Sequence, residues 1–300
     1  MIALICNIIT FFAVIIVNIF SETLPLNGQT TGDISNKLDV LITPAGYTFI
    51  IWFIIYFLCG IWIIRQIPKQ RRNMTIYKVI SPFFIMTNIL NCAWIFLWHY
   101  EQFFASVIIM LALLLTLLYI FNRLKKRELS FLDYAPFSIY FSWVSIAFIV
   151  NLMYYATYKN WIDTNLSGTL STISILIAFS LLSWLIYLKS NDWLYPLVTI
   201  WAFIGISNRN FSAHYNLIAF TAFIAAILLL VLLPIAKKTA ISIVRVRNTY
   251  PFLKNSNDSL IEHLTKLPFE FSNKNYSLNL PRCRNNSRFK LGFFSKAARP

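Results

Sequence analysis

Long apolar runs separated by short polar stretches form the dominant pattern of this chain. Eight runs contain no Asp, Glu, Lys or Arg: Met1–Phe20, Pro44–Ile64, Val79–Trp98, Phe103–Asn122, Pro136–Tyr158, Gly168–Leu188, Trp193–Ile206 and Tyr215–Ala236. Most have about the 20 residues that an α-helix needs to cross a bilayer. Since lipid cannot satisfy backbone hydrogen bonds, such runs favour helices. The pattern therefore predicts an all-α, polytopic transmembrane bundle with eight spans.

Two of the runs have a structural alternative. Met1–Phe20 has the length of a secretory signal, but it lacks a positively charged start and a small-residue cleavage pattern, so we expect a retained helix. Trp193–Ile206 is short and contains Pro196, so a re-entrant segment is its rival.

Loop charges orient the predicted spans, because Lys and Arg accumulate in short cytoplasmic loops. Two loops are rich in Lys and Arg. The loop after the second run contains Arg65, Lys69, Arg71, Arg72 and Lys78. The loop after the fourth run contains Arg123, Lys125, Lys126 and Arg127. The alternate loops carry few basic residues. With eight spans, both termini then lie in the cytoplasm, and we expect a multi-pass integral membrane protein.

The overall composition excludes a soluble protein. Hydrophobic residues make up 58% of the chain and charged residues only 12%, whereas a soluble chain carries roughly a quarter charged residues. The sequence also argues against a transmembrane β-barrel. It has only seven Gly and lacks the segments of about ten residues, alternating between apolar and polar, that barrel strands show.

The segment after the last run differs in kind. Residues 237–300 contain 13 Lys and Arg but 3 Asp and Glu, and so supply +10 of the net charge of +15. We interpret this segment as a solvated, largely disordered cytoplasmic tail. Attraction to anionic lipid is the alternative. Nucleic-acid binding is not expected, because the basic residues are spaced out and no recognition motif accompanies them.

No catalytic or metal-binding motif is visible in the sequence. The apolar runs lack the ionisable groups that ion-coupled carriers usually need. The three histidines, His99, His214 and His263, have no spacing that would gather a metal ion. Motifs for acyl transfer, phosphoryl transfer or dinucleotide binding are missing too. We therefore expect neither a metal nor an enzyme activity.

Three runs instead carry aromatic and amide side chains at helical spacing. One contains Trp52 and Tyr56 four residues apart. The other two stripes are Asn91, Trp94 and Trp98, and Trp143, Ala147 and Asn151. Residues three or four positions apart share a face of a helix, so each run presents one stripe.

These stripes have two interpretations. Trp and Tyr also form interfacial belts, and a buried Asn also links helices by hydrogen bonds. However, Asn91, Trp94 and Asn151 lie deep within their runs, which favours a shared pocket. An uncharged pocket of aromatic rings and amides would suit a flat, apolar ligand such as a tetrapyrrole or a sterol.

The same three runs resemble the tryptophan-rich sensory protein, or translocator protein, family (TspO/MBR, peripheral benzodiazepine receptor-like). The segment TPAGYTFIIWFIIYFLCGIW, Thr43–Trp62, is similar to the family's second-helix signature. NCAWIFLW, Asn91–Trp98, resembles its third-helix motif, although Trp98 stands where Phe is usual. PFSIYFSWVSIAFIVN, Pro136–Asn151, resembles the fifth-helix pattern.

This resemblance implies a five-helix bundle over residues 1–158, followed by three additional helices over 159–236 as in a longer bacterial branch, and by the tail over 237–300. It implies a receptor that binds porphyrin, haem or a sterol, and a homodimer as a candidate assembly. Photochemical degradation of porphyrin, proposed for some relatives, is a minor alternative. The rival functions are transport of an uncharged or amphipathic small molecule and a purely structural membrane role.

Overall fold

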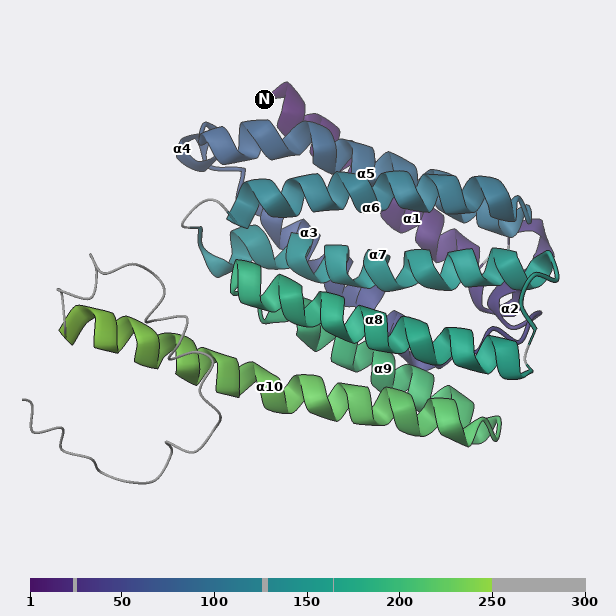
Figure 1. Cartoon of the computed structure of the whole chain (residues 1–300). Coiled ribbons are helices and arrows are strands. Elements are labelled where there is room, and N and C mark those ends of the chain that lie inside the picture. The colour runs from purple at the N-terminus through teal and green to yellow at the C-terminus, as the bar shows by residue number, and fades with distance from the viewer. Residues whose placement is uncertain (24–25, 126–128, 164, 250–300) are drawn as a thin grey trace, which may run out of the picture. The chain divides into compact units, whose positions relative to one another are not determined.

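The computed structural model describes residues 1–23, 26–125, 129–163 and 165–249, with side chains described to residue 235. Every regular element in these ranges is a helix, which confirms the all-α prediction (Figure 1). The helices are α1 Ile2–Thr23, η1 Leu26–Gly28, α2 Thr31–Ser35, η2 Gly46–Ile50, α3 Ile51–Ile64, α4 Lys69–Arg72, α5 Thr75–His99, α6 Phe103–Lys125, α7 Phe131–Tyr158, α8 Leu166–Ser190, α9 Leu194–Ser212 and α10 Asn216–Thr249.

Seven helical segments in the described ranges are long and apolar enough to cross a membrane. They correspond to seven of the eight predicted spans: α1, η2 with α3, α5, α6, α7, α8 and the Asn216–Ile235 part of α10. The chain is therefore an integral, multi-pass membrane protein.

Helix α9 is the eighth predicted span and is not among those seven. It is nevertheless one continuous helix of 19 residues, about 28 Å long at 1.5 Å per residue, without the reversal that a re-entrant segment requires. Its C-terminal turn carries Arg209 and Asn210, and more than half of its residues are buried, including Tyr195 and Phe203. Protein covers much of α9, which explains why it can be less apolar than a lipid-facing helix. That α9 crosses the bilayer stays a prediction.

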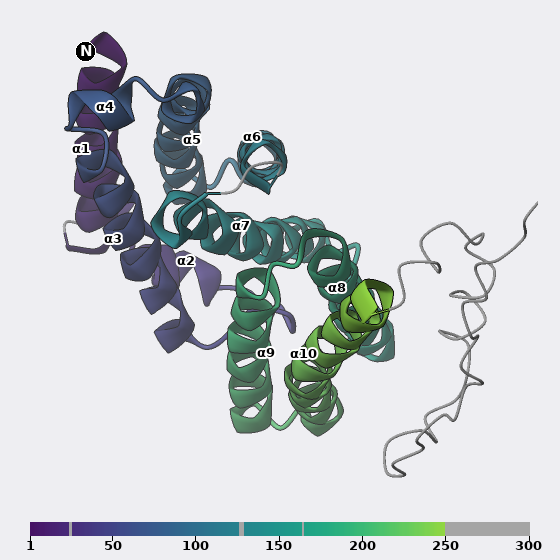
Figure 2. The ribbon, with the colours of Figure 1, turned by 90° about the vertical axis from the view of Figure 1, so that its left-hand side faces the viewer.

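Helix α7 occupies the centre of the bundle. It packs against α6, α3 and α9, and Figure 2 shows it between α1, α3, α5 and α6 on one side and α8, α9 and α10 on the other. Two thirds of its most apolar window is buried inside the protein, and Trp143, Tyr140 and Tyr154 are almost fully enclosed. Helix α7 therefore links α3 and α6 on one side to α9 on the other.

Helix α1 is joined to α5 by polar side chains as well as by apolar packing. The Asn7 amide donates to Ser81 Oγ at 2.9 Å, and Asn88 on α5 donates to Thr10 Oγ1 at 3.1 Å. Asn7 is completely buried. Such paired amides link helices in lipid, so α1 is an integral part of the bundle, as a retained helix would be.

Two ion-pair clusters close the end of the bundle that carries the basic loops. Arg65, just after α3, contacts Asp133 of α7 at 2.9 Å, and Tyr77 donates to the same carboxylate at 2.6 Å. Lys125 of α6 contacts the fully buried Asp192, between α8 and α9, at 2.9 Å. The two loops predicted to share one side of the membrane thus lie at one end of the helices, and their cytoplasmic placement stays a prediction.

Helix α10 continues past residue 237, where we expect the tail to begin, as far as Thr249; the boundary of the tail stays a prediction. Residues Met1–Ser242 form one compact unit. The disorder predicted for the remainder of the tail concerns residues outside the described ranges. The division into a core over residues 1–158 and added helices over 159–236 stays a prediction.

Candidate functional site

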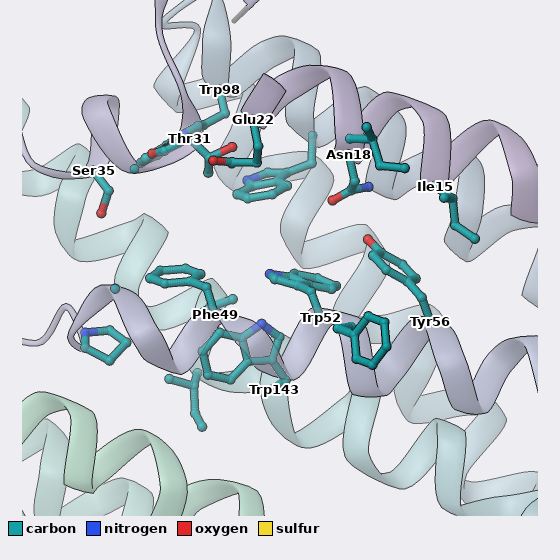
Figure 3. Close-up of a pocket in the computed structure, with 18 of the residues that line it drawn as sticks. Ile15, Asn18, Glu22, Thr31, Ser35, Phe49, Trp52, Tyr56, Trp98 and Trp143 are labelled. Atoms are coloured by element: carbon teal, nitrogen blue, oxygen red, sulfur yellow. Dashed lines mark hydrogen bonds between the residues drawn. The ribbon is translucent and has the colours of Figure 1, made fainter. Parts of the chain in front are cut away.

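A cavity of about 940 Å³ lies between α1 and α3. Residues of α5 and α7 form its floor, and the chain segments around α2 and η2 contribute to one end. Figure 3 shows the side chains of α1 and α3 facing each other across this space. Its volume is at the upper end of the range of about 300 to 1,000 Å³ that is typical of small-molecule sites.

The structure brings seven of the eight predicted site residues to the wall of this one cavity. They come from α3, α5 and α7, and they are Trp52, Tyr56, Trp94, Trp98, Trp143, Ala147 and Asn151. Helical spacing places each stripe on one face of its helix. The packing of the bundle turns these faces of α3, α5 and α7 toward the same cavity.

The aromatic rings of this wall are fixed by contacts with each other. Trp52 stacks on Tyr56 with the ring centroids 5.6 Å apart, and Trp143 meets Trp52 edge-on at 6.4 Å. Trp94 and Trp98 stack at 6.0 Å. These distances are those of favourable aromatic pairs, worth about 0.5–1.5 kcal/mol each beyond their burial. The wall therefore offers rigid, flat faces to a ligand.

Asn91 is the predicted residue that does not line the cavity. It lies behind Tyr56 and is fully buried. Its oxygen accepts from Asn18 at 3.1 Å and from the Tyr56 hydroxyl at 3.3 Å, while its amide donates to the Tyr140 hydroxyl at 3.2 Å. Asn91 thus ties α1, α3 and α7 to α5 and fixes the ring of Tyr56 from behind.

Asn151 and Trp98 combine lining with contacts between elements. The amide of Asn151 donates to Ser106 Oγ on α6 at 3.1 Å. The indole nitrogen of Trp98 donates to the carbonyl of Thr31 at 3.4 Å, and its ring packs on Tyr154 at 4.7 Å. Each of these two residues therefore lines the cavity and also links two elements of the fold.

Two indole N–H groups in the cavity wall have no hydrogen-bond partner among the residues that the structure describes. They are Nε1 of Trp94 and Nε1 of Trp143, and both atoms are buried. An unpaired buried donor costs about 1–3 kcal/mol. A ligand that carries hydrogen-bond acceptors would remove this cost if a small rotation of either ring brought the donor to it.

The sequence interpretation missed the residues that α1 adds to the site. Phe11, Ile15, Asn18 and Glu22 all line the cavity, and Figure 3 shows Asn18 and Glu22 opposite Tyr56 and Trp52. Their spacing of three or four residues was a visible signal. The uniform hydrophobicity of the first run hides this face, because apolar residues surround it on all sides.

Helix α9 holds the segment that covers one end of the cavity. The Trp201 indole donates to the carbonyl of Thr48 at 3.0 Å, and the Asn210 amide donates to the carbonyl of Leu41 at 2.8 Å. The backbone N–H of Ala45 donates to the carbonyl of Gly205 at 3.0 Å. The neighbouring residues Pro44, Gly46 and Phe49 line the cavity, so α9 helps to shape it.

Gly205 is required for this close approach. A Cβ atom at this position would lie 2.2 Å from Cγ2 of Thr48 and 3.1 Å from Cβ of Pro44. These separations are well below an ordinary carbon contact of about 3.5–4.0 Å. Only a residue without a side chain fits between α9 and η2.

A comparison with protein families gives a match to a family model described as TSPO-like protein, over residues 4–235. The match extends past Tyr158 and includes α8, α9 and the apolar part of α10. Comparisons with curated proteins and with solved structures gave no match.

Proposed function

The chain belongs to the family of TSPO-like proteins, and from this premise we propose that it binds a flat, largely apolar ligand, a tetrapyrrole in preference to a sterol, in the cavity between α1 and α3. The observation that carries the proposal is the convergence of Trp52, Trp94, Trp98 and Trp143 on one cavity of about 940 Å³. Rings of this kind bind flat molecules through their faces.

Two features favour a tetrapyrrole over a sterol. The wall is aromatic, and it matches the extended π-system of a porphyrin better than the saturated rings of a sterol. The unpaired indole donors of Trp94 and Trp143 also call for a ligand with several acceptors. A sterol such as cholesterol offers one hydroxyl oxygen, at one end of its ring system, to both donors.

The residues around the cavity support a metal-free porphyrin more than haem. Protein ligands of haem iron are typically His, Cys, Met or Tyr. The described residues that line the cavity include no His, Cys or Met. The one Tyr among them, Tyr56, donates its hydroxyl to Asn91. A haem would therefore have to bind through its faces and edges alone.

A fluorescence titration tests the proposal. Purified protein in detergent is titrated with protoporphyrin, with hemin and cholesterol in parallel, and tryptophan emission is followed. We expect saturable quenching by protoporphyrin at micromolar concentration, since four tryptophans surround the site. Replacing Trp52 with Phe should weaken binding several-fold. The matched control is Trp161→Phe, whose side chain is 70% exposed and does not line the cavity. Tryptophan emission that stays unchanged with protoporphyrin would refute the proposal.

The same preparation separates the rival functions. A transporter would move the ligand into proteoliposomes, whereas a binding protein would retain it without net uptake. A purely structural protein would give no response to any ligand, and its tryptophan substitutions would change only thermal stability.

A further inference from the structure

We infer that Arg209 of α9 recognises an acidic group on the ligand, so that the cavity selects planar carboxylic acids over their uncharged analogues. This inference rests on the proposed function and concerns the same cavity. The predicted ligand residues all lie within residues 1–158. This inference adds a ligand contact from α9, which lies outside that range.

Arg209 is suitably placed for this role. It lies in the last turn of α9 and lines the cavity, and its side chain is half-buried. One guanidinium nitrogen donates to Oδ1 of Asn36 at 3.2 Å. A guanidinium has five N–H donors in a planar fork, so this bond leaves a carboxylate-binding edge available.

The carboxylates of the described residues leave the charge of Arg209 uncompensated at close range. Asp39 contributes an electrostatic attraction, but the described residues form no ion pair with Arg209 within 4.0 Å. Glu22 is the one carboxylate among the described lining residues, and it too makes no such contact. A ligand carboxylate could therefore pair with the guanidinium without displacing a partner.

Because the rest of the cavity wall is mostly uncharged, the charge of Arg209 determines whether a ligand carboxylate can bind there. Among the described lining residues Arg209 alone is positively charged, and most of the others are apolar or aromatic. A carboxylate that enters such a site without a partner carries a large desolvation cost. Pairing with Arg offsets this cost, because a guanidinium binds a carboxylate through two parallel, charge-assisted hydrogen bonds.

Glu22 gives the ligand a direction. It belongs to α1 and is exposed at the rim, and Figure 3 shows it near Trp98 and Thr31. Like charges repel, so an acidic ligand would turn its carboxylate toward Arg209 and its uncharged part toward the tryptophans. Replacing Glu22 with Gln should strengthen acid binding, the reverse of the effect at Arg209.

The test compares protoporphyrin with its dimethyl ester, which has the same ring system but no carboxylic acid. Both are titrated into the full-length wild-type protein, Arg209→Gln and Arg209→Lys in detergent. We expect wild type to prefer the acid. Arg209→Gln should weaken acid binding at least tenfold and leave ester binding within about twofold, and Arg209→Lys should restore part of the acid preference. The control is Arg123→Gln, an exposed arginine of α6 that does not line the cavity.

Each outcome decides a separate question. If wild type binds the acid and the ester equally, or if Arg209→Gln weakens both to the same degree, the inference is wrong while the proposed function stands. If wild type binds neither probe, the proposed function fails and the inference fails with it. A general loss of structure in Arg209→Gln would lower ester binding too, so the ratio of the two affinities separates recognition from misfolding.

Discussion

Replacing Gly205 with Ala tests whether α9 shapes the cavity through its contact with η2. The new Cβ atom would lie 2.2 Å from Cγ2 of Thr48. Restoring an ordinary carbon contact requires Thr48 to leave its rotamer, which breaks the bond from its hydroxyl to the Ala45 carbonyl, or α9 and η2 to separate by roughly 1.5 Å. Overpacking of this kind typically costs about 1–3 kcal/mol.

The separation would also strain two hydrogen bonds. The bond from Ala45 N–H to the Gly205 carbonyl and the bond from the Trp201 indole to the Thr48 carbonyl are both 3.0 Å long. Each contributes about 1 kcal/mol, so overpacking and the loss of both bonds cost about 3–5 kcal/mol together, or about 2–4 kcal/mol after the gain in helix propensity from Gly to Ala. Helix propensity alone predicts the opposite sign, because Ala is about 1 kcal/mol better than Gly within a helix.

Thermal unfolding of the purified protein in detergent measures this effect. For a domain of 150–250 residues, 1 kcal/mol shifts Tm by about 2–4 °C, so we expect Gly205→Ala to lower Tm by about 5–15 °C. It should also weaken binding of protoporphyrin, since Pro44 and Phe49 line the cavity. Gly46→Ala is the matched control for the change in Tm, because a Cβ atom there meets nothing within 4 Å; it is no control for binding, since Gly46 lines the cavity. An unchanged or raised Tm for Gly205→Ala would refute the packing argument.

Three further substitutions test other parts of the structure. Asn91→Ala removes hydrogen bonds to three side chains and should lower the free energy of unfolding by about 2–3 kcal/mol. Its control, Asn88→Ala, removes one hydrogen bond to a side chain and should cost about 1 kcal/mol or less. Equal losses in thermal unfolding would contradict the role given to Asn91. Asp192→Ala leaves a lysine without its buried partner and should cost about 3–5 kcal/mol, a value that a wild-type Tm would disprove. The ammonium of Lys37 lowers the pKa of Glu101. This pair therefore stabilises the fold above the usual glutamate pKa of about 4.3 and loses that contribution as the pH falls through the lowered value. Lys37→Gln should show a smaller loss of Tm between pH 6 and pH 3 than the wild type, and an identical pH profile would argue against this role of the pair.

The helices could be predicted from the sequence because bilayer length and the absence of charge mark them directly. The boundaries were less accurate where polar residues extend a helix. Helix α7 begins at Phe131, not at Pro136, because Asp133 is paired with Arg65 and Tyr77 and can therefore enter the helix. Such pairing depends on neighbours that spacing along one helix cannot reveal.

The candidate site was predictable to the extent that it follows helical periodicity. The spacing of Trp52 and Tyr56 fixes their common face in any α-helix. Spacing alone places Asn18 on one face of α1 with Ile15 and Glu22, but it does not show that this face meets α3. The contribution of Arg209 likewise depends on which helix lies beside η2. Nor could spacing distinguish Asn91, behind the wall, from Trp94, which forms it.

The most direct test of the central claim is to fill the cavity and measure binding of protoporphyrin. Ala147 lines the cavity from α7, so Ala147→Trp would place an indole inside it. Val231→Trp is the control, since Val231 on α10 is 51% exposed and does not line the cavity. We expect Ala147→Trp to abolish saturable binding while Val231→Trp binds as the wild type does. Wild-type affinity in a folded Ala147→Trp variant would contradict the assignment of the ligand to this cavity.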